Sequence, residues 1–140
     1  MGNHPDSFYI QSAVIPYRII DGKLRILLIT SRRRKRWIAP KGVVEPDMTP
    51  ADSAAKEAWE EAGIRGEVDQ QALGEYTYKK WGGTCTVTVY AMHVTKELRK
   101  WPEDFRSRKW LSPKQAAKRV REKDLKRLIK RFAKEMKVTL

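Results

Sequence analysis

The chain has 140 residues, of which 41% are hydrophobic, and a formal net charge of +13 from 30 basic and 17 acidic side chains. This length suits one domain, spanning residues 1–140, with a real core. The single cysteine excludes an internal disulfide, and no apolar run approaches about 18 residues, which argues against a membrane span. We therefore expect a cytoplasmic protein with phosphate-rich partners.

The first part of the chain is predicted to form strands joined by tight turns. An Asp21-Gly22 turn joins two segments with strand character, and Pro16 indicates an edge or a bulge in the first of them. The polar stretch 1–8 before them is expected to fray. The predicted strands of this part are residues 12–17, 23–30 and 37–39.

Five consecutive cations, residues 32–36, follow the second strand. One interpretation is a solvated basic loop. The other is a phosphate clamp, because the planar guanidinium of arginine binds phosphate oxygens in bidentate fashion. Lys41 lies a few residues further on, at the edge of the metal site proposed below, where it would meet a phosphate.

Residues 49–63 have the start and the end of a helix. Thr49 suits the N-cap, Pro50 suits the first helical position, and Gly63 suits the left-handed conformation that ends a helix. Alanines gather on one face and allow close approach to a sheet or another helix. They are Ala51, Ala54, Ala55, Ala58 and Ala62.

Three glutamates of this helix, Glu57, Glu60 and Glu61, fall within about 100° of one another on an adjoining face. Like charges at this spacing repel, so stability alone does not favour the arrangement. A hard divalent cation removes the conflict, because Mg²⁺ prefers oxygen ligands and takes one or two carboxylates together with substrate phosphate oxygens. The plain alternative is a solvated acidic helix face.

Strands and then two helices are predicted for the second half of the chain. The strands are expected at residues 66–78, 86–94 and 110–111. Ser112-Pro113 begins a helix that ends near residue 121, and Asp124 begins the last one. The last helix carries an apolar stripe of Leu125, Leu128, Ile129 and Phe132. Its basic outer face is interpreted as solvated, with RNA binding as the alternative.

Residues 42–64 resemble the Nudix box, G-x5-E-x7-R-E-U-x-E-E-x-G-U, where U is an aliphatic residue. Seven of its nine defined positions agree: Gly42, Glu57, Ala58, Glu60, Glu61, Gly63 and Ile64. Met48 replaces the first Glu of the box, and Lys56 replaces its Arg. The resemblance extends over nearly the whole chain and implies an α/β fold, an α/β/α sandwich with a mixed sheet.

Within this superfamily the chain is most similar to the diphosphoinositol polyphosphate and diadenosine polyphosphate phosphohydrolases. The similarity rests on residues 30–32, 36–38, 40–46, 94–101 and 106–110. The inositol phosphate enzymes also carry a basic cluster just before the first strand. Ile10 and Gln11 stand there in this chain, which argues against the inositol phosphate alternative.

The resemblance also implies a set of site residues. Glu57 and Glu61 would bind the metal, with Glu60 as general base or further ligand and the carbonyl of Gly42 completing the site. Glu57 is the second candidate for a catalytic role. A fourth carboxylate from outside the box would be Glu97 or Glu103. By the resemblance, Ser31, Arg32, Arg106 and Arg108 would hold substrate phosphates, and the basic run and its surroundings add Arg36 and Lys41.

The expected function is Mg²⁺-dependent hydrolysis of a pyrophosphate bond, with Mn²⁺ as the alternative ion. The substrate would be a nucleoside-diphosphate-linked compound or a polyphosphate, of the diadenosine polyphosphate or diphosphoinositol polyphosphate type. One alternative is an RNA 5′-end pyrophosphohydrolase, which the basic surface permits. Another is a non-catalytic module that binds nucleotides or nucleic acid. No oligomeric state is predicted.

Overall fold

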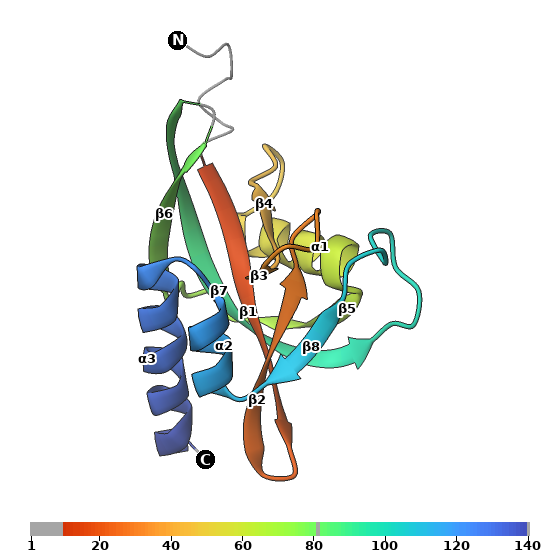
Figure 1. Cartoon of the computed structure of the whole chain (residues 1–140), viewed down its shortest axis with the longest axis vertical. Helices are drawn as coiled ribbons and strands as arrows, with labels where there is room; N and C mark the ends of the chain where they lie inside the picture. The colour runs from red at the N-terminus through yellow and green to blue at the C-terminus, as the bar shows by residue number, and fades with distance from the viewer. Residues whose placement is uncertain (1–9, 81, 140) are drawn as a thin grey trace.

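The computed structural model describes residues 10–80 and 82–139, so the expected fraying of residues 1–8 lies outside the described part. Eight strands and three helices follow one another along these residues (Figure 1). The strands are β1 (Ile10–Ile20), β2 (Lys23–Thr30), β3 (Trp37–Ile38), β4 (Lys41–Val43), β5 (Ile64–Val68), β6 (Gly74–Lys80), β7 (Gly83–Glu97) and β8 (Arg108–Leu111). The helices are α1 (Pro50–Ala62), α2 (Pro113–Arg119) and α3 (Lys123–Thr139).

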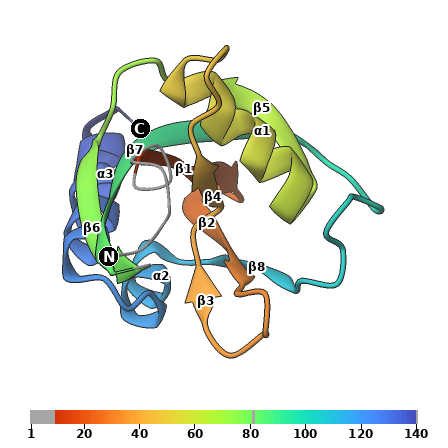
Figure 2. The same ribbon diagram turned by 90° about the horizontal axis from the view of Figure 1, so that it is seen from above.

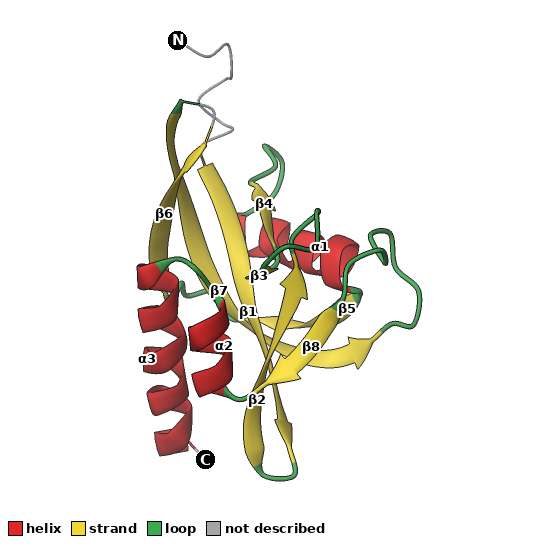
Figure 3. Ribbon diagram, in the orientation of Figure 1, coloured by secondary structure: helices red, strands yellow, loops and turns green. Residues whose placement is uncertain are grey.

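The strands form one mixed sheet with the order β3-β2-β1-β7-β5, while β4 pairs with β1, β6 with β7 and β8 with β2. The central pair β1 and β7 is parallel, and the other pairs are antiparallel. Helix α1 covers one face, and α2 and α3 lie side by side on the other (Figures 2 and 3). This confirms the predicted α/β/α sandwich.

The core consists of two clusters, one on each face of the sheet. Strand β2 contributes to both, because alternate side chains of a strand point to opposite faces. Leu27 and Ile29 pack toward α1, whereas Ile26 and Leu28 pack toward α2 and α3. Cover on both faces explains why this strand is a nearly continuous apolar run in the sequence.

The expectation that Pro16 marks an edge or a bulge is wrong in position, since β1 is central and Pro16 pairs with Met92 of β7. On its other side, β1 changes partner. It pairs with β4 as far as Ala13 and with β2 from Tyr17 onward. The N–H of Val14 points to that side, toward the carbonyl of Pro40, and N–H groups two residues apart share a side. Pro16 therefore falls where β1 exchanges one partner for the next.

The ends of α1 lie where the sequence predicts them. The Thr49 side chain accepts a hydrogen bond from the N–H of Asp52 at 3.1 Å, and Gly63 has a φ of 66°. Two strand predictions change. Residues 41–43 form β4, where the sequence analysis predicted no strand, and the single extended segment 66–78 is replaced by β5 and β6 with a turn between them. In the described part of the chain, no helix is long and apolar enough to cross a membrane.

Candidate active site

A cleft of about 360 Å³ opens between β4, the basic 31–36 loop and the segment just before β8. Seven residues predicted for the site line it: Ser31, Arg32, Arg36, Lys41, Gly42, Glu61 and Arg106. Gln11 and Lys80 also line the cleft, although the sequence analysis did not assign them to it. Three other predicted residues, Glu57, Glu60 and Arg108, are not part of this lining.

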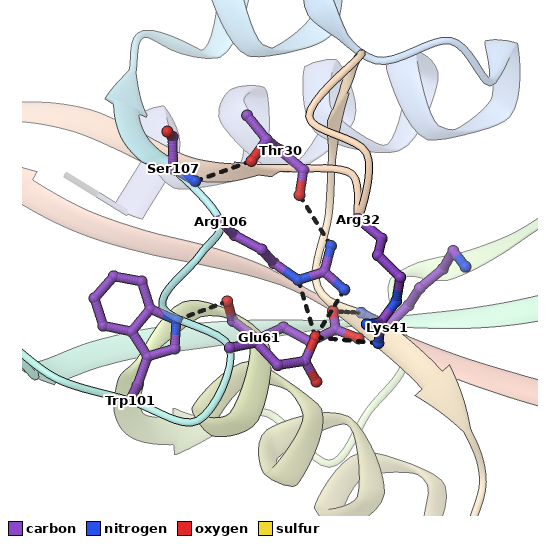
Figure 4. A network of polar contacts seen from close by, with 8 residues as sticks. Thr30, Arg32, Lys41, Glu61, Trp101, Arg106 and Ser107 are labelled. Atoms are coloured by element: carbon purple, nitrogen blue, oxygen red, sulfur yellow. Dashed lines mark hydrogen bonds and ion pairs between the residues drawn. The ribbon is translucent and has the colours of Figure 1, made fainter.

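Helix α1 brings Glu61 to the cleft because its alanine face packs closely on the sheet. Ala54, Ala58 and Ala62 are fully buried there. Glu61 is only 8% exposed, and its Oε1 accepts a hydrogen bond from the backbone N–H of Lys41 at 3.1 Å. Figure 4 shows Glu61 beside Lys41, with the indole of Trp101 donating to the backbone carbonyl of Glu61 at 3.0 Å.

The carboxylate of Glu57 lies directly against Gly42. A Cβ added to Gly42 would lie 2.3 Å from Glu57 Cδ and 2.6 Å from both carboxylate oxygens. No real Cβ tolerates such distances, so the glycine leaves the space that the carboxylate fills. Helix α1 and β4 thus meet at a pair of residues that both belong to the box.

The two carboxylates nearest the cleft ionise reluctantly. Burial, together with the nearby negative charges of Glu60 and Glu103, raises the pKa of Glu57 to about 7. Burial likewise raises the pKa of Glu61 to about 8, although the hydrogen bond from Lys41 opposes the shift. Burial lowers the pKa of the Lys41 amine. Burial thus disfavours the charged forms of all three groups, because water does not solvate them well.

Glu60 is turned toward Lys56 instead of the cleft. Lys56 Nζ lies 3.8 Å from Glu60 Oε1, as the i, i+4 spacing predicts, but its nearer partner is Glu45 Oε1 at 2.7 Å. Glu45 stands three residues before Met48, where the box has its first Glu. A carboxylate at a shifted position therefore connects the box loop to α1, an interaction that the sequence analysis missed.

Of the two proposed fourth carboxylates, Glu103 lies beside the box glutamates and Glu97 does not. The backbone N–H of Glu103 donates to the carbonyl of Glu60 at 2.9 Å, and its charge raises the pKa of both Glu57 and Glu61. Glu97 instead pairs with Arg18 and Arg108, each at 3.3 Å.

Arg106 is the most buried cation of the cleft, with 7% of its surface exposed. Its guanidinium donates to the carbonyl of Thr30 at 3.0 Å and to Oε1 of Glu103 through two nitrogens, at 2.9 and 3.1 Å (Figure 4 shows the bond to Thr30). The exposed Arg32 approaches the same Oε1 at 3.7 Å. Glu103 therefore holds two phosphate-binding candidates beside the box carboxylates.

The basic loop is closed by Ser31. Its hydroxyl accepts hydrogen bonds from the N–H groups of Lys35 and Arg36, at 3.2 and 3.3 Å. Arg36 lines the cleft and pairs with Glu122 at 3.1 Å. Ser31 thus shapes the loop that presents the arginines.

Arg108 lies at the C-terminal end of α1, away from the cleft lining. Its guanidinium donates to the carbonyls of Ala62, Gly63 and Leu98, and packs over Trp101 at 4.0 Å from the ring centroid. A cation at a helix C-terminus satisfies unpaired carbonyls and complements the helix dipole. These contacts assign Arg108 a structural position.

The donors suit a hard cation, although they do not enclose one. Among the described residues, no three acidic, histidine or cysteine side chains converge closely enough to hold a metal ion between them. Glu60 faces Lys56 and Glu103 faces Arg106, so Glu57 and Glu61 remain. Two carboxylates, with further positions left to substrate phosphates and water, match the habit of Mg²⁺.

Comparisons with known proteins agree with this geometry. The NUDIX domain family model matches residues 10–132. The chain therefore belongs to the NUDIX domain family and is classed with the Nudix hydrolases.

Two curated relatives and one solved structure illustrate the relationship. Nudix hydrolase 13, mitochondrial, of Arabidopsis thaliana is 31% identical over 156 residues, covering 95% of this chain and 77% of that protein. Human diphosphoinositol polyphosphate phosphohydrolase 3-alpha is 31% identical over 117 residues, covering 81% of this chain and 70% of that protein. A binary complex of the Caenorhabditis elegans Ap4A hydrolase shares the fold, with a TM-score of 0.77 at 21% identity over 91% of this chain and 97% of that chain.

Proposed function

We propose that the protein is a Mg²⁺-dependent hydrolase of pyrophosphate bonds in nucleoside-diphosphate-linked or polyphosphate substrates. The observation that carries the proposal is the buried Glu61 carboxylate, which shares one cleft with Arg32, Lys41 and Arg106. Oxygen donors for a cation and basic donors for phosphate thus line the same cleft. Names of relatives that include diphosphoinositol polyphosphate phosphohydrolase and Ap4A hydrolase support this substrate class.

In the proposed mechanism, Glu57, Glu61 and the carbonyl of Gly42 hold the ion. Mg²⁺, when bound there, would supply Lewis acidity toward the phosphate oxygens and the attacking water. Glu60 or Glu57 accepts the proton of the attacking water, and Glu60 would have to turn its carboxylate from Lys56 toward the cleft to do so. Helix α1 carries these glutamates, so their relative positions are set before substrate arrives.

The basic side chains would neutralise the charge of the phosphates. Arg106 is fixed by Thr30 and Glu103, whereas Arg32 keeps 73% of its side chain exposed and is free to follow a substrate. Lys41 donates to Tyr78 Oη at 3.1 Å, which directs its amine across the cleft. Arg36 is the further phosphate ligand, Ser31 orients the loop, and Glu103 is proposed as the fourth carboxylate.

Nucleoside-linked substrates are favoured over inositol pyrophosphates. Gln11, which the sequence analysis placed in the region where the inositol phosphate enzymes are basic, lies inside β1, and its Oε1 accepts a hydrogen bond from Tyr78 Oη at 2.8 Å. A neutral amide already engaged by a phenol adds no charge for a densely phosphorylated ring.

The test is Glu61→Gln, assayed for Mg²⁺-dependent hydrolysis of diadenosine tetraphosphate. Removing one metal-binding charge should lower turnover by about 10²- to 10³-fold. Glu67→Gln, an exposed carboxylate of β5, is the matched control and should retain activity. A Glu61→Gln protein that folds, as thermal unfolding reports, yet keeps near-normal turnover would refute the metal role.

A substrate panel separates the alternatives. Diadenosine polyphosphates, diphosphoinositol polyphosphates and 5′-triphosphorylated RNA would be compared, with analysis of the released phosphate or pyrophosphate. Preference for the RNA would instead identify an RNA 5′-end pyrophosphohydrolase. RNA binding without metal and without hydrolysis of any phosphoanhydride would identify a binding module.

We also propose a reducing compartment such as the cytoplasm. Cys85 is buried and is the single cysteine of the sequence, so the chain forms no internal disulfide, which suits that environment. Because Arabidopsis relatives are named mitochondrial, cell fractionation with compartment markers is the direct test.

A further inference from the structure

More than half of the net charge lies on the face of the molecule opposite α1. Residues 113–137, which span α2 and most of α3, contain eleven lysines and arginines and three acidic side chains, a net charge of +8 of the total +13. Figures 1 and 2 show these helices side by side, on the other side of the sheet from α1. None of these residues lines the catalytic cleft, although Glu122 pairs with Arg36, which does.

Arginines neutralise the acidic residues of this segment. Asp124 pairs with Arg127 at 3.2 Å, and Glu135 pairs with Arg131 at 3.5 Å. The third acid, Glu122, pairs with Arg36 of the basic loop. The carboxylates of the segment are therefore engaged, and the charge of its lysines is left without compensation from them.

Four lysines of the segment surround one groove between α2 and α3. The groove has a volume of about 240 Å³, and its lining consists of Lys114, Lys118, Lys126, Lys130 and Ala117. Lys126 Nζ donates to the carbonyls of Ala117 and Lys118, at 2.8 and 3.3 Å, which fixes one ammonium group at the end of α2. Like charges gathered around a hollow repel, and an anion in the hollow relieves the repulsion.

The composition of this face selects a class of partner. Large exposed apolar side chains in the described part of the chain are Ile10, Ile19 and Phe105, all outside α2 and α3. A helix that docks on a membrane needs such side chains, and the centre of a protein interface is rich in aromatics and depleted of lysine. Lysines without apolar neighbours suit a nucleic-acid phosphate backbone.

We propose that the groove between α2 and α3, walled by Lys114, Lys118, Lys126 and Lys130, binds the phosphate backbone of a nucleic acid. Binding there leaves the α1 cleft open, so it is independent of the hydrolytic reaction. Lysines are point charges without bidentate geometry, so the affinity depends on salt and little on base sequence.

The experiment measures binding of the full chain to fluorescent single strands of about 20 nucleotides, in RNA and DNA form, by anisotropy between about 50 and 200 mM salt. The groove variant is K114Q/K118Q/K126Q/K130Q. Its matched control is K23Q/K96Q/K100Q/K109Q, which removes four exposed lysines elsewhere and leaves the same net charge. The triple variant K114Q/K118Q/K130Q retains the Lys126 hydrogen bonds and guards against loss of folding.

We expect the groove variant to bind at least about 30-fold more weakly, with a log–log salt slope reduced by about 2 to 3 for single strands. The triple variant should show most of this loss, and the control should stay within about threefold of wild type. A difference between the RNA and DNA arms would identify which nucleic acid is bound. Arg32→Gln, which removes an exposed cation of the cleft, should bind normally, because Arg32 does not line the groove.

Three results would overturn the proposal. Equal losses in the groove and control variants would show that bulk charge alone attracts the strand. Loss of binding in Arg32→Gln would place the strand in the catalytic cleft. No binding by wild type at low salt, or binding only to vesicles of anionic lipid, would exclude a nucleic-acid site. Hydrolysis of diadenosine tetraphosphate by the groove variant reports separately on the proposed function.

Discussion

The two helical layers of this protein pack on the sheet in opposite ways. Helix α1 contacts it through alanines, so its backbone lies close and its glutamates reach β4. Helix α3 contacts it through Leu125, Leu128, Ile129 and Phe132, all buried. Each alanine of α1 buries little apolar surface, but the close packing positions the charged side chains at the cleft. The larger apolar side chains of α3 bury more apolar surface than the alanines of α1 do.

This comparison predicts that stability and chemistry can be damaged separately. Phe132→Ala should lower the free energy of unfolding by about 3 to 5 kcal/mol, because it empties a position that is 4% exposed. Turnover of the folded protein at low temperature should be unchanged. Urea unfolding and assays below the transition measure both quantities.

The matched control is Phe105→Ala, the same change at a side chain that is 43% exposed. It should cost less than about 0.5 kcal/mol. If folded Phe132→Ala lost turnover in proportion to its stability, the two layers would not be separable.

The reverse effect is expected on the α1 side. Gly42→Ala puts a Cβ into the space of the Glu57 carboxylate and should push that side chain aside. We expect a loss of about 100-fold in Mg²⁺-dependent kcat/KM, because small displacements in a catalytic site have effects of this size. The unfolding free energy should change little, since the end of a flexible side chain can move.

Glu57→Asp sharpens this test, because the shorter side chain vacates the space. Adding Gly42→Ala to Glu57→Asp should cost less than adding it to wild type. Additive losses would mean that the glycine acts through something other than Glu57.

Charge placement by α1 also has a pH signature. The pKa of Glu61 is about 8 in the folded protein and 4.5 ordinarily. Between these two pH values the folded protein keeps a proton that the unfolded chain releases. The stability linked to protonation of Glu61 is fully present below pH 4.5 and is lost as the pH rises through about 8. Metal-free protein should therefore lose on the order of 2 kcal/mol of stability over this window.

Glu61→Gln should flatten this dependence and stabilise the metal-free protein at pH 8, as denaturant titrations at several pH values would show. Mg²⁺ should reduce the difference by binding the ionised wild type. A wild type whose stability rises between pH 5 and 8 to the same extent as that of the variant would contradict the assignment.

The smallest expected effect separates Arg108 from the residues of the cleft. Arg108→Met removes donors from the last carbonyls of α1 and should cost about 1 to 2 kcal/mol of stability. The KM for diadenosine tetraphosphate should stay within about twofold, because Arg108 does not line the cleft. A large rise in KM with normal stability would restore its predicted role in phosphate binding.

What the sequence could predict depended on how local the signal was. The limits of α1 follow from Thr49 and Gly63, whose caps involve only neighbouring residues. The buried strand β2 follows from its own apolar run. These predictions needed no knowledge of the rest of the chain.

Side-chain roles set by distant partners could not be read in this way. Arg106 and Arg108 are two residues apart and chemically identical, yet one meets Thr30 and Glu103 and the other meets the end of α1. Glu97 and Glu103 differ for the same reason. The shifted pairing of Glu45 with Lys56 depends on how the box loop folds back, which the motif alone does not specify.

The parallel pairing of β1 with β7 has a consequence for biosynthesis. Ile10 pairs with Thr86 and Tyr17 with His93, so the middle of the sheet joins an early and a late segment of the chain. Until about residue 83 has been synthesised, β1 lacks its partner β7, and α1 lacks part of the sheet on which it packs. We expect the nascent chain to stay open until β7 emerges, and then to close around it, which makes the passage of residues 83–97 out of the exit tunnel the commitment point of its folding.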